Sequence, residues 1–239
     1  SGVGALTKVG TGTQTLLGIA SYSGPTTLDD GRLRIESTDN IGAGPVVFTG
    51  DSTLEIFGSA PFATSRAMQL DAAGTLEVTN SAGVTWDGEL AGAGSLTKDG
   101  PGELTLTAAN SYAGGTVIEA GRLIVSADDN LGTGGVTFSG DATLALTGAA
   151  AFATAKPLTL DAAGTVEVTN PAGASWDGAI GGAGSLTKTG PEALALTGGN
   201  SYAGGTVLAD GRLIVSADGN LGTGDVTVAG AATLEITGG

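Results

Sequence analysis

The pentapeptide Gly-Ser-Leu-Thr-Lys at Gly94–Lys98 returns unchanged at Gly184–Lys188, and Gly4–Lys8 is an earlier, nearly identical copy. Consecutive copies begin 90 residues apart and no gap separates them. A chain of this kind is an array, and an array supplies length and repeated surface rather than one unique site. The same period relates Tyr22, Tyr112 and Tyr202, Trp86 and Trp176, Phe62 and Phe152, and Arg32, Arg122 and Arg212.

The repeats divide the chain into residues 4–93, 94–183 and a partial copy at 184–239. With 44 glycines and only 4% aromatic residues, the chain lacks the large side chains that fill a wide core. A thin core shared by stacked repeats fits this composition better. We therefore expect residues 1–239 to form a single elongated segment of a larger protein.

Charge and special residues exclude several partners. A formal net charge of −15 disfavours nucleic acids and anionic membrane surfaces, which require basic patches. No apolar stretch approaches the length of a membrane helix, so we expect no direct membrane insertion of this segment. There is no cysteine, hence no disulfide or thiolate site. Ser1 begins directly in repeat sequence, so any export signal is expected outside this chain.

Apolar residues alternate in short bursts, as at Leu104 and Leu106 or at Val166 and Val168. Turn signals such as Ala120-Gly121 follow the bursts at a spacing of roughly ten residues. This is the period of β-strands, and it predicts about nine strands per copy with very little helix.

Two architectures accommodate many short strands: an antiparallel sandwich or barrel, and a parallel β-solenoid. The repeat favours the solenoid, because stacked coils place like residues above one another in a continuous core. We expect about three coils per 90-residue copy, although four shorter coils also fit. Buried positions should exchange only among aliphatic residues and exposed ones should vary, as Ile35/Val125/Val215 and Ile56/Leu146/Ile236 contrast with Glu55/Ala145/Glu235.

The stretch Trp176–Gly190, continued by Asn200–Thr206 and Gly211–Leu213, resembles the passenger-associated repeat of bacterial autotransporters. The resemblance covers the fixed order Trp-x-Gly, Gly-x-Leu-x-Lys-x-Gly, Asn-x-Tyr-x-Gly-Gly-Thr and Gly-x-Leu. It extends through essentially the whole chain. The first copy departs from it, with Gln14 where Leu104 stands and Pro25 where Gly115 stands.

This resemblance implies a right-handed parallel β-helix on the surface of a Gram-negative bacterium or released from it. It also implies type V secretion, in which a C-terminal β-barrel of the same polypeptide exports the passenger and anchors it in the outer membrane. That barrel is expected outside the present sequence.

Catalytic and metal chemistry find little support. Without histidine or cysteine, the usual general base, the imidazole-paired nucleophile and the common zinc sites are excluded. Paired acids such as Asp29-Asp30 and Asp128-Asp129 are the residues left for glycoside hydrolysis, but they stand where turns begin, and Asp129 becomes Gly219 in the next copy. No Gly-Gly-x-Gly-x-Asp calcium repeat occurs, and aligned ice-binding threonines are not evident in every coil. We expect no enzyme activity, cofactor or metal.

Aromatic residues are the candidate binding residues, since exposed rings can stack on sugars or anchor proteins. The candidates are Trp86, Trp176, Tyr112 and Tyr202, although each ring stands beside a glycine turn, where packing over a corner is the stronger interpretation.

Other recurring polar residues have simpler expected roles. Asn110, Asn200, Asn130 and Asn220 should hydrogen-bond turn backbone. We expect Lys98, Lys188, Arg122 and Arg212 to project outward and form weak ion pairs.

The sequence therefore predicts a surface-exposed or secreted passenger segment that acts as a rigid stalk or scaffold for adhesion or self-association. Its partners would be further copies of itself, or a glycan or protein on a host or cell surface. The alternatives are a polysaccharide-active β-helix enzyme, and a module that binds a glycan or host protein directly through the solenoid side.

Overall fold

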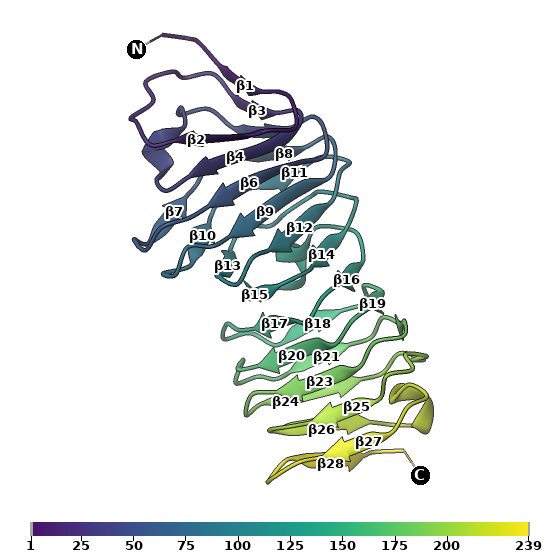
Figure 1. Cartoon of the computed structure of the whole chain (residues 1–239). Helices are drawn as coiled ribbons and strands as arrows, with labels where there is room; N and C mark the ends of the chain where they lie inside the picture. The colour runs from purple at the N-terminus through teal and green to yellow at the C-terminus, as the bar shows by residue number, and fades with distance from the viewer. Residues whose placement is uncertain (1, 239) are drawn as a thin grey trace. The chain divides into compact units, whose positions relative to one another are not determined.

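The computed structural model describes residues 2–238; Ser1 and Gly239, the ends of the expected segment, lie outside the described residues. The described part consists of short β-strands and three 3-10 turns, with no α-helix among residues 2–238 (Figure 1). This confirms the all-β prediction. The contacts group the chain into two compact units, Ser1–Val117 with Asp129–Gly134, and Ile118–Asp128 with Gly135–Gly239.

Strands of two to five residues make up both units, because the apolar bursts are equally short. In the first unit they are β1 (Leu6–Lys8), β2 (Thr13–Leu16), β3 (Thr26–Leu28), β4 (Gly31–Ile35), β5 (Val46–Phe48), β6 (Ser52–Ile56), β7 (Phe62–Thr64), β8 (Met68–Leu70), β9 (Gly74–Val78), β10 (Val84–Trp86), β11 (Leu90–Ala91), β12 (Leu96–Asp99), β13 (Glu103–Leu106) and most of β14 (Thr116–Ile118), with the 3-10 turn η1 (Thr38–Asn40).

The second unit holds β15 (Gly121–Val125), β16 (Val136–Phe138), β17 (Ala142–Leu146), β18 (Phe152–Thr154), β19 (Leu158–Leu160), β20 (Gly164–Val168), β21 (Ala174–Trp176), β22 (Ile180–Gly181), β23 (Leu186–Thr189), β24 (Ala193–Leu196), β25 (Thr206–Leu208), β26 (Arg212–Val215), β27 (Val226–Val228), β28 (Thr233–Ile236) and the 3-10 turn η3 (Asp218–Asn220). The turn η2 (Asp128–Leu131) divides between the units.

Each unit has three parallel sheets. Those of the first run β1-β3-β5-β8-β11, β2-β4-β6-β9-β12 and β7-β10-β13. Those of the second run β15-β17-β20-β23-β25-β27, β16-β19-β22 and β18-β21-β24-β26-β28. Because every strand pairs in parallel with a strand one coil away, the chain winds as a parallel β-solenoid, as the repeat predicts.

The coils are shorter than expected. Along one sheet of the first unit the paired residues are Leu6, Thr26, Val46, Met68 and Leu90, so a coil takes 20 to 22 residues. A 90-residue copy therefore contains slightly more than four coils, which replaces the expectation of about three. The copy at 94–183 starts eleven strands, β12 to β22, rather than nine. The spacing was overestimated because strands of two or three residues leave too weak an alternation to recognise.

A copy is not a whole number of coils, so equivalent strands lie in different sheets. In the first unit β1 and β12 are equivalent, yet β1 pairs with β3 while β12 joins the sheet of β9. In the second unit β15 and β26 are equivalent, and they also belong to separate sheets. Within a unit, strands one copy apart thus lie on different faces, and an outward feature of one strand is not repeated on the same face by its equivalent.

Columns of like side chains fill the core. The inward positions of β4, β6 and β9 stack Leu33 on Leu54 on Leu76, all fully buried. Each such aliphatic side chain contributes about 1.5–3 kcal/mol through its burial. The aliphatic exchanges therefore mark the core as predicted, except at Ile236, which lies in the last strand of its sheet and is 62% exposed.

The positions expected to be solvated differ from prediction. Glu55 and Ala145 are both buried, and Glu235 of that set is half-buried. Arginine side chains from the preceding strand cover Glu55, so an outward residue of this solenoid is not automatically a wet one.

Candidate functional site

The two tryptophans are buried in the core. Trp86 stacks between Thr64 and Leu106 in an inward column, and its indole Nε1 donates to the carbonyl of Arg66, 2.8 Å away in the preceding coil. Trp176 is equally buried, and its Nε1 donates to the carbonyl of Lys156 at 2.9 Å. Neither ring presents a face to solvent, which is the arrangement that the packing interpretation predicts.

The two candidate tyrosines occupy equivalent buried corners. Tyr112 shares a hydrogen bond of 2.6 Å with Thr116 Oγ1, and its ring lies against Gly132, where a Cβ would stand 2.8 Å from the ring edge. Tyr202 makes the same 2.6 Å hydrogen bond to Thr206. Burial raises the pKa of both phenols, so they remain neutral hydrogen-bonding groups at neutral pH.

The recurring asparagines hold turn backbone, as predicted. Asn110 Oδ1 accepts from Leu90 N at 2.8 Å, and its Nδ2 donates to the carbonyl of Asn130 at 2.6 Å. Asn200 repeats both contacts with Ile180 and Asn220. These amides join the corners of neighbouring coils, and they are buried there.

The lysines are placed differently from the prediction. Lys98 and Lys188 are 0% exposed and lie in inward columns, paired with Leu76 and with Val166. The amine of Lys188 donates to the carbonyls of Thr189, Gly190 and Asp210 at 2.7, 2.7 and 3.2 Å. The expectation of outward lysines failed because a long side chain can stack its methylenes in the core and still place its amine among corner carbonyls.

One sequence signal marked these lysines. The residue after them varies freely among Val9, Asp99 and Thr189, whereas the lysine and the glycine two positions later recur in all three copies. A recurring residue beside a variable one indicates an inward position, because outward neighbours drift.

The arginines do project outward. Arg122 pairs with Glu167, with 3.0 Å between Nη2 and Oε2, and Arg212 pairs with Glu235 at 2.9 Å. These side chains are partly exposed, so each pair contributes at most about 1 kcal/mol.

The largest charge cluster lies on the outer side of the first unit. Arg32 Nη1 and Arg34 Nε donate to Glu55 Oε2 at 2.9 and 2.7 Å, and Arg32 also pairs with Glu77. Burial alone would raise the pKa of Glu55, but hydrogen bonds from Arg34, Arg32 and Thr79 outweigh it and hold that pKa below the usual value. The cluster is internally neutralised and leaves no free charge for a ligand.

The acid pairs lie in turns. Asp30 Oδ1 accepts from the backbone N–H of Gly31 at 2.7 Å, and Asp29 Oδ1 accepts from Thr49 Oγ1 at 3.2 Å. Asp128 forms a 2.7 Å ion pair with Lys156. Within residues 2–238, no three acidic side chains gather in a way that would hold a metal ion.

Outward threonines align more than the sequence indicated, since Thr53, Thr75 and Thr97 are partners on three successive strands. They form a single row, because the next outward row holds Glu55, Glu77 and Asp99.

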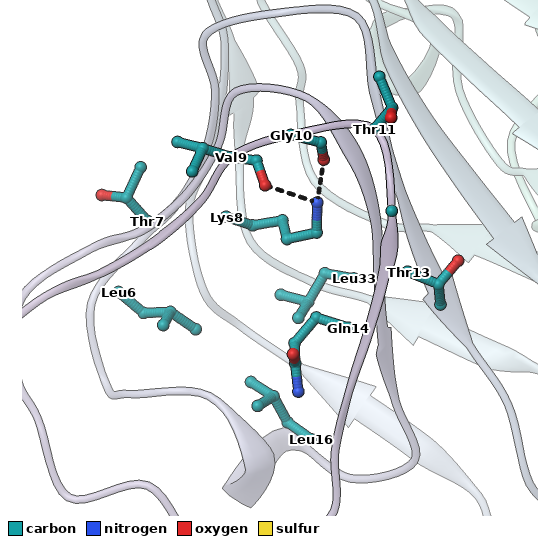
Figure 2. A pocket seen from close by; sticks show the side chains of 11 residues that line it. Leu6, Thr7, Lys8, Val9, Gly10, Thr11, Thr13, Gln14, Leu16 and Leu33 are labelled. Atoms are coloured by element: carbon teal, nitrogen blue, oxygen red, sulfur yellow. Dashed lines mark hydrogen bonds between the residues drawn. The ribbon is translucent and has the colours of Figure 1, made fainter.

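A hollow of about 500 Å³ opens beside the first coil. Leu6, Leu16 and Leu33 line it together with Lys8 and Gln14 (Figure 2). These are core-type positions of β1, β2 and β4, so the hollow is lined by the inner side of a coil and is not a convergence of polar groups.

In the described part of the chain, no helix is long and apolar enough to cross a membrane.

Comparisons with known proteins agree with this architecture. The family model of the passenger-associated-transport-repeat matches residues 6–35, 96–125 and 186–215. Each match begins at the lysine-bearing strand, β1, β12 or β23, and the matches are 90 residues apart. No solved structure matches the chain.

A curated relative, the adhesin BmaC autotransporter of Brucella suis biovar 1 (strain 1330), is 36% identical over 236 residues. The alignment covers 98% of this chain and 6% of the relative. The three repeat matches and this similarity along nearly the whole chain place the protein in the family of autotransporter passenger domains.

Proposed function

We propose that this chain is a surface-exposed or secreted segment of a longer autotransporter passenger, and that it serves as a rigid scaffold in a stalk used for adhesion or self-association. The relative is an adhesin by name, but the chain spans only 6% of its length. Adhesion is therefore proposed for the whole passenger, and the mechanical role for this segment.

The observation that carries the proposal is the unbroken stacking within each unit. In the second unit, the inward column of β15, β17 and β20 runs Leu123, Leu144, Val166, and Lys188 of β23 continues it. Every strand of these coils is paired with neighbours through backbone hydrogen bonds and through its side-chain column. Stacked coils resist deformation because bending them would open the packed column.

The regularity of the connections supports a scaffold. Measured between paired residues, the coils are nearly equal in length, between 19 and 22 residues. Binding and catalytic residues are usually carried by longer, irregular loops. We infer that the segment has no enzymatic role; its paired acids Asp29 and Asp30 are engaged in turn hydrogen bonds. We also infer that Trp86, Trp176, Tyr112 and Tyr202 act in packing.

The partner of the complete passenger is proposed to be a glycan or protein on a host or cell surface, or another copy of the passenger. The acidic surface of this segment, with a net charge of −15, would repel anionic cell surfaces. A spacer with these properties keeps an adhesive region accessible without attaching itself.

Two measurements on the purified chain test the proposal. In the first, the labelled chain is incubated with cultured host cells and with a glycan array. A scaffold gives no saturable binding, whereas saturable binding that unlabelled chain displaces would replace the scaffold by a binding module.

In the second, the chain is stretched between its ends by force spectroscopy. A rigid scaffold resists extension and then yields in steps as coils peel away. Smooth extension at low force, like that of an unfolded linker, would contradict the mechanical role.

A further inference from the structure

The lysine of each copy stands where an aliphatic residue is expected. Lys8 pairs with Leu28, Lys98 with Leu76, and Lys188 with Val166 and Leu208. Burying an ammonium group in such a column is costly unless all its hydrogen-bond donors find partners. A residue that recurs despite this cost indicates a role other than filling the core.

The amine meets a corner of backbone carbonyls. Lys8 Nζ donates to Val9 O at 3.1 Å and to Gly10 O, and both contacts are drawn in Figure 2. Lys98 donates to the two equivalent carbonyls, of Asp99 and Gly100, at 2.9 and 2.8 Å. These two acceptors lie in the turn that directly follows the lysine, so they are available to it in any stacking register.

The third acceptor belongs to the next coil. Lys8 Nζ lies 2.9 Å from the carbonyl of Asp30, and Lys188 Nζ lies 3.2 Å from that of Asp210. Each acceptor is 22 residues further along the chain. An ammonium group carries three protons, so the two local carbonyls leave one proton for the following coil.

The following coil is shaped to provide that acceptor. Gly31 comes directly after Asp30 and adopts a positive φ of 70°, and a Cβ on it would stand 2.8 Å from Lys8 Nζ. Gly211 follows Asp210 with a φ of 71°, and a Cβ there would meet the carbonyl of Gly190. Only glycine allows the two coils to approach this closely at the corner.

The apolar pattern alone does not distinguish one register from another. Strands alternate in and out with a period of two, so a shift by two residues keeps every apolar side chain on the inner face. Because the copies are nearly identical, a strand could also pair with a strand of the wrong copy and still bury the same residues. A buried polar group whose partners exist in one register alone resolves this ambiguity, a role known for single polar residues in coiled coils.

We propose that Lys8 and Lys188 each fix the stacking register of their unit, by requiring the following coil to place a backbone carbonyl and a glycine at its corner. The lysine is a positioning residue for the coil that comes after it. This inference does not depend on the proposed function.

Engineered disulfides can report the register, because the chain has no cysteine of its own. Thr187 and Val207 are partners on β23 and β25, so a T187C/V207C pair lies within the distance that a disulfide bridges. In a T187C/A209C pair the cysteines are two residues out of register, roughly 7–8 Å apart, and cross-link readily only after a slip.

Chains that carry either cysteine pair, with and without Lys188→Met, are refolded from urea and oxidised. The yield of each disulfide cross-link is then measured. Methionine keeps a long apolar side chain and removes the ammonium group. We expect the yield of the slipped cross-link relative to the native one to rise about tenfold, while far-UV circular dichroism and the urea midpoint stay at or above those of the parent. Arg212→Met is the matched control: it removes an exposed positive charge from the following coil and should leave the ratio unchanged.

An unchanged ratio in Lys188→Met would overturn the proposal. A Lys188→Met chain that fails to fold would overturn it as well, because a residue that only selects among registers leaves the native one accessible. An equal rise in Arg212→Met would attribute the effect to general charge and would likewise exclude a register role.

Discussion

The two units have the same interior and different exteriors. In the first, Arg34 on β4 and Glu55 on β6 are cross-strand partners joined by a 2.7 Å hydrogen bond. In the second, the equivalent partners on β15 and β17 are Ile124 and Ala145. The charged pair has thus been replaced as a pair by apolar residues, whereas inward neighbours such as Leu54 and Leu144 hardly change.

This difference shows which positions depend on one another. An inward residue must suit the whole column above and below it, so its type is fixed by many contacts. An outward residue must suit mainly its cross-strand partner, so both the charged pair and the apolar pair are compatible solutions. The third copy holds a mixed pair, Ile214 and Glu235, in which the carboxylate binds Arg212 instead. We therefore expect outward partners to be energetically coupled.

The largest effect should come from the interior, where we expect both units to respond alike. Trp86→Ala and Trp176→Ala each leave a cavity and an unpaired backbone carbonyl, and each should lower the free energy of unfolding by about 3–5 kcal/mol. Urea denaturation followed by circular dichroism measures this. Trp86→Phe and Trp176→Phe, which keep an aromatic ring, serve as controls and should lower the free energy of unfolding by less.

A difference between the two tryptophan variants well beyond 1 kcal/mol would break the equivalence of the two interiors. If a tryptophan variant lost a binding activity while its stability stayed unchanged, the ring would instead have a role in recognition.

The next effect tests the coupling outside. Ala145→Glu introduces a carboxylate beside Ile124 and beside Glu167, at a position that is fully buried. The second unit has Ile124 in place of Arg34, so the new carboxylate lacks that arginine partner. We expect Ala145→Glu to lower the free energy of unfolding by about 3 kcal/mol. Adding Ile124→Arg recreates the pair of the first unit and should recover most of that loss.

The double variant decides the outcome. If Ile124→Arg/Ala145→Glu is as unstable as the sum of the two single variants, the outward partners are independent and the explanation by coupled pairs is wrong. Ala145→Ser, which adds a polar group without charge, separates the effect of size from that of charge.

The pH dependence of the free energy of unfolding should reflect buried lysines that occur in both units. Burial lowers the pKa of Lys98 and Lys188 to about 8, although Asp99 beside Lys98, and Asp210, Glu192 and Glu167 around Lys188, act in the opposite direction. An unfolded lysine titrates near 10.4, so between these pH values the unfolded chain holds more protons, and the free energy of unfolding rises with pH. We expect about 1–3 kcal/mol per lysine.

Above about pH 10 the tyrosines reverse the trend. Burial raises the pKa of Tyr112 and Tyr202, so the folded chain then holds more protons than the unfolded one, and stability falls. Urea titrations from pH 7 to 11 should trace a maximum. Lys98→Met/Lys188→Met should abolish the rise and keep the fall, and a decline starting at pH 8 in the parent chain would contradict the assignment.

The fold was predictable because its main signal is repeated. Alternation at Leu104 and Leu106, recurring 90 residues later at Leu194 and Leu196, was sufficient to indicate strands in a stacked array. Coil length was not, because a strand as short as Leu90–Ala91 has too few residues to show a period. The number of coils follows from pairing, which a single sequence does not display.

The lysine corner and the Arg34–Glu55 cluster were missed for one physical reason. Charged side chains were assigned to solvent by type, whereas burial here depends on what lies across the next coil. The carbonyl of Asp210 in the following coil completes the hydrogen bonding of Lys188, and arginines from the preceding strand cover Glu55. Neither partner is adjacent in sequence, so neither contact was visible before the register was known.

The smallest effect should separate the two exteriors once more. Glu55 accepts hydrogen bonds from two arginines and is buried, whereas Glu167 faces one arginine and is partly exposed. Glu167→Gln should therefore cost less than about 1 kcal/mol and depend visibly on salt, because exposed ion pairs are screened. Glu55→Gln should cost more and respond less to salt, since burial shields its pairs. If Glu55→Gln and Glu167→Gln lower the free energy of unfolding equally at low and high salt, the Glu55 cluster is no stronger than the Arg122–Glu167 pair. The exchange of Arg34 and Glu55 for Ile124 and Ala145 would then be energetically neutral.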